Sequence, residues 1–199
     1  YTGGVKAVIW TDAVQFGFAV PESDGLGAGD ARGAGRVPVV ERAREGDHTD
    51  AHGQATSAAA STWIVQKAER DAMFADRPAQ IMQPAHFSAL KDANAKILND
   101  EDYDVFGDGT VVLMSTPGHT PGHQVLWVKT AKHGGIVLAG DLYHYPEERT
   151  TGKTPSFEFN AEQSKRSRAR IETFLKQTGA QLWIEHDIAT HASLPKSPK

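Results

Sequence analysis

The sequence predicts an α/β fold in which sheets are covered by helices, either a sandwich or part of one. Three observations support this. Short apolar runs of strand length occupy residues 110–114, 124–129 and 136–139. A stretch of helical length follows at 160–178, and a further apolar run at 181–184 returns to the sheet. Such an order, with short runs before and after a long amphipathic helix, is typical of layered α/β structures.

The elements expected before residue 110 are shorter. They are a strand at 63–65, helices at 67–74 and 87–98, and an extended segment at 103–106. The Gly-Asp-Gly sequence at 107–109 predicts a hairpin-type turn, because glycine readily adopts the backbone conformations that tight turns need.

The helix at 160–178 has both of its ends marked in the sequence. Asn160 is a good N-cap, and Gln163 stands three residues later, as in a capping box. Gly179 is well placed to end the helix in a left-handed conformation. Its apolar face comprises Ile171, Phe174 and Leu175.

The chain is predicted to have two unlike parts, residues 1–60 and residues 61–199. The first holds about half of the 19 glycines and includes the low-complexity stretch 25–36. Such a segment buries too little apolar surface to offset its chain entropy, so an irregular or aberrant segment is expected. A Gly/Ala/Arg-rich stretch is also what GC-rich DNA encodes in a wrong frame. Two islands, 5–10 and 37–40, have the composition of strands.

Composition argues against several classes of protein. With a net charge of −4 we expect no nucleic-acid partner, and the basic run at 165–170 is interpreted as a solvated helix face because Glu162 and Glu172 share that helix. There is no cysteine, so disulfides and thiolate nucleophiles are excluded. No apolar run approaches about 18 residues and no signal-peptide pattern is visible, so we expect no membrane association and a cytoplasmic location. The oligomeric state is not indicated.

Three candidate metal ligands follow apolar runs. His119 lies in the sequence T-P-G-H-T-P-G-H at 116–123, Asp141 follows the run at 136–139, and His186 follows the run at 181–184. Side chains at strand ends sit on rigid supports along one rim of a sheet. Imidazole and carboxylate are ligands of zinc, and also of iron or manganese.

The sequence at 116–123 resembles the second metal motif of the metallo-β-lactamase superfamily, and the later Asp141 and the E-H-D turn at His186 resemble its N-acyl homoserine lactonase branch. The likeness covers residues 63–187. It implies a metallo-β-lactamase-like αββα sandwich, here incomplete or altered in its N-terminal part. It also implies one or two zinc ions held by His119, Asp141 and His186.

The family's first metal motif, H-x-H-x-D-H, does not occur in this chain. In the family it supplies about four of the seven ligands of a dinuclear site. The nearest substitutes are His48, Asp50 and His52, which have the right residue types but the wrong spacing. They are weaker candidate metal ligands than the later three, and a polar loop with incidental histidines is the alternative.

Two residues after Asp141 are candidate catalytic groups. Homoserine lactonases often place a tyrosine three residues after the bridging aspartate, where this chain has His144, next to Tyr143. Either side chain is a candidate for transition-state assistance, and aromatic packing beside a pocket is the alternative. The resemblance implies that His123 is structural.

Each metal candidate also has a simpler interpretation: a loop histidine for His119, a turn or helix-cap aspartate for Asp141, and a surface histidine for His186. The resemblance favours a zinc-dependent hydrolase of small-molecule lactones or other esters that is impaired because the first motif is missing. A non-catalytic degenerate or truncated protein of the same fold and a glyoxalase-II-like thioesterase are the alternatives.

Overall fold

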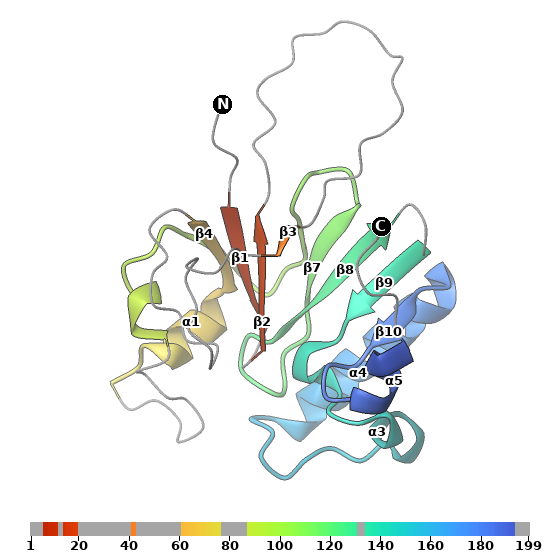
Figure 1. Ribbon diagram of the computed structural model, residues 1–199. Helices are drawn as coiled ribbons and strands as arrows, with labels where there is room; N and C mark the ends of the chain where they lie inside the picture. The colour runs from red at the N-terminus through yellow and green to blue at the C-terminus, as the bar shows by residue number, and fades with distance from the viewer. Residues whose placement is uncertain are drawn as a thin grey trace, which may run out of the picture. The chain divides into compact units, whose positions relative to one another are not determined.

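The computed structural model describes residues 61–76, 87–130 and 134–193, and the backbone of three strands nearer the N-terminus (Figure 1). These strands are β1 (Lys6–Thr11), β2 (Val14–Ala19) and β3 (Glu41–Arg42). The chain divides into two compact units. One comprises residues 1–65 and 73–97, and the other comprises residues 66–72 and 98–199.

The first unit contains a five-stranded sheet in the order β3-β2-β1-β4-β5, with β4 at Ser61–Gln66 and β5 at Ala95–Leu98. Strand β1 pairs antiparallel with β2 and parallel with β4. Its described core comprises Trp63, Val65, Met73, Phe87 and Leu90.

The helix predicted at 87–98 is wrong. Only a short 3₁₀ turn, η1 (Ser88–Leu90), forms there, and the chain then extends as β5. The Trp63 amide of β4 donates to the Asn94 carbonyl at 2.8 Å, so strand pairing satisfies this backbone in place of a helix. The helix predicted at 67–74 is confirmed as α1 (Lys67–Met73).

The second unit is built on a sheet of order β10-β9-β8-β7-β6. Its strands are β6 (Tyr103–Asp104), β7 (Val111–Ser115), β8 (Gln124–Thr130), β9 (Gly134–Leu138) and β10 (Gln181–Trp183). Neighbours pair antiparallel, except that β10 runs parallel to β9. The crossover between β9 and β10 carries the long helix, as a parallel connection requires.

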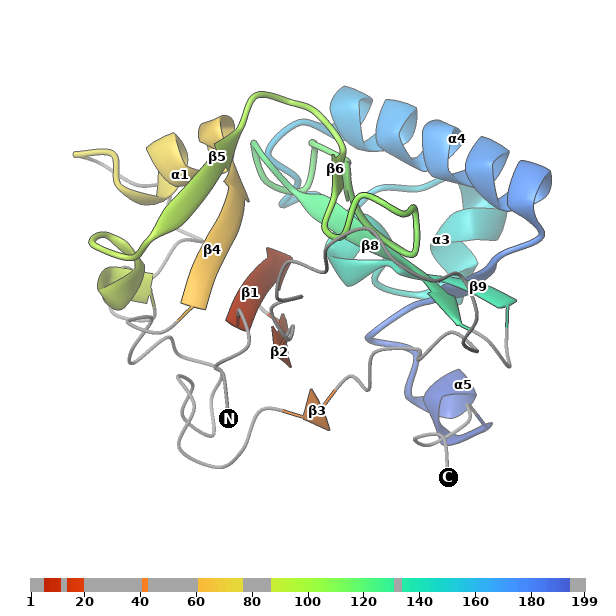
Figure 2. The same cartoon turned by 90° about the horizontal axis from the view of Figure 1, so that it is seen from above.

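Helix α4 (Ala161–Thr178) lies along one face of this sheet (Figure 2). Both predicted ends are confirmed, since the Asn160 side chain accepts from the amides of Glu162 and Gln163, and Gly179 adopts φ 69°. The buried core between helix and sheet comprises Met114, Val125, Val137, Ala139, Leu142, Tyr143, Ile171 and Leu175.

Three short helices complete the unit: η2 (Gly140–Leu142), α3 (Pro146–Thr151) and α5 (Ile188–Ser193). The predicted turn at 107–109 is confirmed, with φ 74° at Gly107 and 73° at Gly109. The strand predicted at 37–40 lies outside the described residues, and so does the irregular stretch predicted at 25–60, apart from the short strand β3. Among the helices that the structure describes, none has the length and apolarity needed to cross a membrane.

Ile171→Ala is expected to destabilise this unit by about 2–5 kcal/mol, because Ile171 is fully buried between α4 and the sheet and its truncation leaves a cavity. Urea unfolding at equilibrium measures the change. Lys176→Ala, on the exposed side of the same helix, is the control and should cost less than about 0.5 kcal/mol. Equal losses for the two variants would contradict this packing.

Candidate metal centre

The loop at 116–123 joins β7 to β8 and is closed by its own backbone. The Thr116 amide donates to the His123 carbonyl at 2.8 Å, and the Gly118 amide donates to the Thr120 carbonyl at 2.9 Å. Strands β7 and β8 pair directly up to the loop, so its two ends are fixed by the sheet. The result is a compact turn that buries His119, which is 8% exposed.

Gly118 lies against the first turn of α4. Its φ is +146°, and a Cβ placed there would come within 2.2 Å of the Ser164 backbone nitrogen. Only glycine tolerates this approach. Two hydrogen bonds hold the contact: the Asn160 amide donates to the Gly118 carbonyl at 2.8 Å, and the Ser167 hydroxyl donates to the Pro117 carbonyl at 2.7 Å.

A second support of the loop comes from α1. The Gly122 amide donates to Glu69 Oε2 at 2.7 Å. A Cβ on Gly122 would come within 2.6 Å of the Glu69 Cβ, so this contact is also close. Burial raises the pKa of the Glu69 carboxyl, although hydrogen bonds from Thr120 and Gly122 partly oppose that effect.

His123 is fully buried and links the loop to η2. Its Nε2 accepts from the Asp141 amide at 3.1 Å, and its Nδ1 lies 2.9 Å from the Thr116 hydroxyl. Burial, with the nearby His119, lowers the pKa of His123 to about 4. The ring is therefore neutral near pH 7, as its acceptor role at Nε2 requires.

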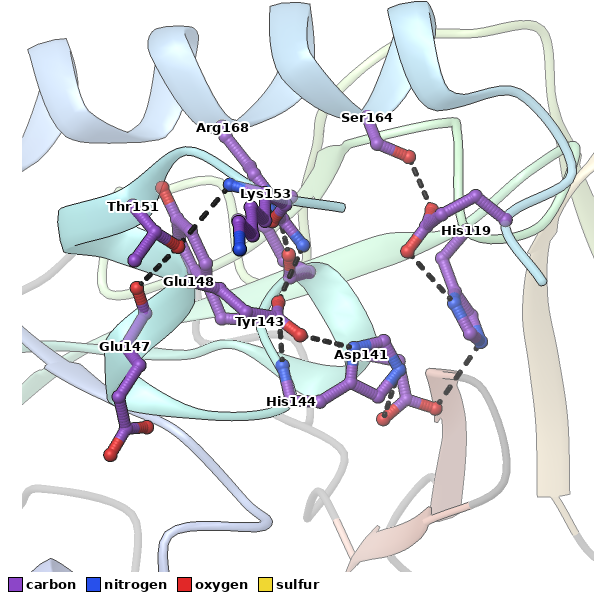
Figure 3. A network of polar contacts seen from close by, with 12 residues as sticks. His119, Asp141, Tyr143, His144, Glu147, Glu148, Thr151, Lys153, Ser164 and Arg168 are labelled. Carbon is purple, nitrogen blue, oxygen red and sulfur yellow. Dashed lines mark hydrogen bonds and ion pairs between the residues drawn. The ribbon is translucent and has the colours of Figure 1, made fainter. Parts of the chain in front are cut away.

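Histidine side chains lie beside both carboxylate oxygens of Asp141, and Figure 3 shows two of them, His119 and His144. Asp141 is 4% exposed. His119 Nε2 lies 3.5 Å from Oδ2, and His186 Nε2 lies 2.8 Å from Oδ1. His144 Nε2 is 3.9 Å from the same Oδ1. The structure thus brings the three residues predicted as metal ligands together, although their metal role remains a prediction.

His186 enters from the turn after β10, with its side chain 42% exposed. Of its acidic neighbours, Asp187 accepts from the Thr190 amide at 3.0 Å and so caps α5. Glu185 is different. Both of its carboxylate oxygens are buried without a hydrogen bond within the described ranges. Burial, followed by the charge of Asp141, raises the pKa of Glu185 to about 8.

His144 and Tyr143 point to different partners. The Tyr143 hydroxyl donates to Glu172 Oε1 at 3.2 Å, and its ring packs in the core beneath the Arg168 guanidinium. Burial, with the nearby Glu172, raises the pKa of Tyr143. His144 instead lies beside Asp141, and its ring centroid is 5.0 Å from that of His119. The geometry therefore places His144, and not Tyr143, beside the candidate metal ligands Asp141 and His119.

Glu158 is a member of the site that the sequence analysis missed. Its Oε1 lies 3.5 Å from His119 Nδ1, and its Oε2 accepts from the Ser164 hydroxyl. Burial raises the pKa of the Glu158 carboxyl, but the contact with His119 and the bond from Ser164 outweigh that effect and keep the pKa below its usual value. Glu158 lies just ahead of the Asn160 cap and belongs to no sequence motif, so only the tertiary structure shows that it is part of the site.

The weaker metal candidates His48, Asp50 and His52 lie outside the described residues, so their placement stays a prediction. The structure therefore neither adds them to the centre nor removes them from it.

Comparison with protein-family models finds no match. Curated relatives do match. The chain is 33% identical over 99 residues to an N-acyl homoserine lactonase of Azorhizobium caulinodans, covering 50% of this chain and 38% of the relative. It is 29% identical over 165 residues to an N-acyl homoserine lactonase of Rhizobium johnstonii, covering 81% of this chain and 62% of the relative. The chain thus spans roughly 38–62% of the length of these relatives.

Solved structures agree with this. An N-acyl homoserine lactone hydrolase with a product bound at its catalytic metal centre matches with a TM-score of 0.57 and 27% identity, covering 70% of this chain and 52% of that one. A quorum-quenching lactonase matches with a TM-score of 0.56 and 28% identity, covering 68% and 52%. The C-terminal part of the chain is related to the N-acyl homoserine lactonases. The predicted α/β fold is confirmed as metallo-β-lactamase-like.

The residues of this lactonase-like centre suit a cation. Two carboxylates, Asp141 and Glu185, lie close enough for the charge of Asp141 to raise the pKa of Glu185, an effect that the backbone of Gly140 only partly opposes. Their repulsion is relieved by a proton or by a positive ion. Imidazole nitrogens face Asp141 from two sides, as zinc ligands would. His119, Asp141 and His186 could therefore hold a metal ion.

Gly118→Ala is expected to displace the loop from α4 and lower the melting temperature of the protein. The added methyl overlaps the Ser164 backbone, in addition to the strain of a positive φ. Thermal unfolding followed by circular dichroism measures it. Gly152→Ala is the matched control, since φ there is +67° and no atom lies within 4 Å of the new Cβ. A loss no larger than that of the control would contradict the close contact.

Proposed function

We propose that this chain is a metal-dependent hydrolase of lactones or other esters of small molecules, impaired in its metal binding. The observation that carries the proposal is the Asp141 carboxylate, which is buried and faces His119 with one oxygen and His186 with the other. Relatives that are N-acyl homoserine lactonases support lactones as the substrate class.

The roles of the residues follow from their positions. Asp141, His119 and His186 would hold the metal, because the two carboxylate oxygens of Asp141 face different histidines. When bound, zinc supplies a Lewis acid and lowers the pKa of a bound water toward about 7, which makes hydroxide available. His123 keeps the Asp141 backbone in place through its neutral Nε2.

His144 is placed to assist at the reacting carbonyl. It is 8% exposed and lies beside both Asp141 and His119. Glu148 anchors it, because its Oε2 accepts from the His144 amide at 3.2 Å and its Oε1 lies 3.5 Å from Nδ1. An imidazole so held can donate a hydrogen bond to a carbonyl oxygen or to the leaving alkoxide.

Phe157 provides apolar surface next to this group. It is 54% exposed, and its ring meets the rings of His119 and His144 edge-on at centroid distances of 5.9 and 5.3 Å. An ester whose acyl part is apolar would bury area against this ring, at roughly 25 cal/mol per Å². Phe157 therefore supports a substrate with an apolar acyl group.

The proposed impairment follows from the missing first motif. Three protein ligands suffice for one catalytic zinc, but in the family these three are divided between two ions. Without the other ligands a metal is held by only one or two groups at each position. We expect fewer than two zinc ions per chain and weak turnover. A chain that binds two zinc ions and hydrolyses a lactone efficiently would contradict this, and would direct mutagenesis to His48, Asp50 and His52.

The two alternatives predict different measurements. A glyoxalase-II-like thioesterase would hydrolyse thioesters faster than lactones or aryl esters. A non-catalytic protein would neither retain zinc after chelator treatment and reconstitution nor hydrolyse any of the three.

Asp141→Asn is expected to lower any lactone hydrolysis by more than about 100-fold, because it removes a charged side chain that would hold the metal that activates water. Initial rates with a homoserine lactone measure this. Asp187→Asn is the control, because that side chain only caps α5. Equal effects of the two substitutions would contradict the role of Asp141.

Phe157→Ala is expected to raise KM for lactones with long acyl chains several-fold and to leave short-chain substrates nearly unchanged, since it removes apolar contact alone. Phe159→Ala is the control. Phe159 is similarly exposed, but the described residues show no ring contact between it and either histidine. An effect independent of chain length would contradict this assignment.

A further inference from the structure

We propose that His119, His144 and Glu158 form a site for one divalent zinc ion that needs no residue of the first 60. Each of the three offers one ligand atom, and these atoms lie within 4.8 Å of one another. Two imidazoles and one carboxylate are a complete ligand set of a catalytic zinc, with water in the fourth position. Neither His144 nor Glu158 belongs to the metal motifs that the sequence shares with the superfamily.

The three side chains are withdrawn from solvent, each being no more than 10% exposed. Glu158 Oε1 is buried and makes no hydrogen bond within the part of the chain that the structure describes. Buried polar atoms without hydrogen bonds are rare, because the loss of water is costly. A bound cation would satisfy such a carboxylate oxygen.

The separation of His119 Nδ1 and Glu158 Oε1 also fits an ion better than a hydrogen bond. At 3.5 Å it exceeds the roughly 2.7–3.2 Å of a good N–H···O bond. Two ligands on a tetrahedral zinc, each about 2.0–2.2 Å from the metal, are separated by about 3.3–3.6 Å. The ligand atom of His144 lies within 4.8 Å of the other two.

The described supports of the three groups come from residues beyond the first 60. Glu158 is fixed by the Ser164 hydroxyl, and the next amide, Phe159, donates to the His119 carbonyl at 3.1 Å. His144 is held by Glu148, whose Oε2 accepts from Arg168 Nη2 at 2.7 Å. Figure 3 shows Arg168 reaching from α4 into this network. A carboxylate on the second nitrogen of a ligating histidine orients the ring.

This site competes with the centre at Asp141 and His186. Both use His119, and a neutral imidazole has only one nitrogen with a free lone pair. With one ion bound, the other ring nitrogen carries the proton and donates to the remaining carboxylate. The chain therefore binds a single zinc ion. The ion lies at the site formed by His119, His144 and Glu158, because all three of these side chains are buried.

Zinc titration of the metal-free chain against a chromophoric zinc chelator tests this without any substrate, so the result is independent of lactone hydrolysis. His144→Gln and Glu158→Gln are compared with His186→Gln and with Glu147→Gln, an exposed control on α3. We expect one zinc ion per chain. His144→Gln and Glu158→Gln should weaken zinc binding at least about tenfold, whereas His186→Gln and Glu147→Gln should weaken it less than about threefold. The visible spectrum of bound Co²⁺ should change only in His144→Gln and Glu158→Gln.

Three results would overturn the proposal: no zinc retained by the unmodified chain, unchanged affinity in Glu158→Gln, or a loss in His186→Gln as large as in the other two. Melting of each metal-free variant checks folding. If Glu158→Gln melts at a lower temperature than the unmodified chain, Glu158→Asp, which keeps the charge, replaces it. The same loss of zinc affinity is expected, because the Asp carboxylate is one methylene further from the metal. An unchanged zinc affinity in that variant would also count against the site.

Discussion

The close approach of Gly118 to the first turn of α4 is the contact on which the centre depends. No side chain fits between them, so the loop backbone and the helix backbone touch directly. The hydrogen bonds from Asn160 and Ser167 then fix the loop in register with the helix. Because Glu158 and Ser164 belong to the same segment, this contact also places a second carboxylate beside His119.

The centre concentrates groups that are costly to bury. The histidines 119, 144 and 186 gather around Asp141, and the carboxylates of Glu158 and Glu185 lie on the outside of this group. Burial and the charge of Asp141 raise the pKa of Glu185 to about 8, and a positive ion bound nearby would favour the ionised form of this carboxyl.

The two proposed cation positions differ in where their ligands come from, and His144 belongs to only one of them. At Asp141 and His186 the chain has two of the motif residues that carry its resemblance to the lactonases, but it has no H-x-H-x-D-H sequence. At His144 and Glu158 the ligands come entirely from the described unit around α4, which includes its own cap and core. A loss of the first motif would therefore shift the preferred position of a single ion and reduce hydrolysis without abolishing metal binding.

The sequence by itself determined the local structure and half of the site. Asn160 and Gly179 marked α4 because capping is a local interaction, and the motif at 116–123 with Asp141 and His186 marked three candidate ligands through their spacing. Local propensity failed at 87–98, where pairing with β4 outweighed it. Only the tertiary structure decided the placement of Glu158 and His144, and turned Tyr143 toward Glu172, since these depend on contacts between segments distant in the chain.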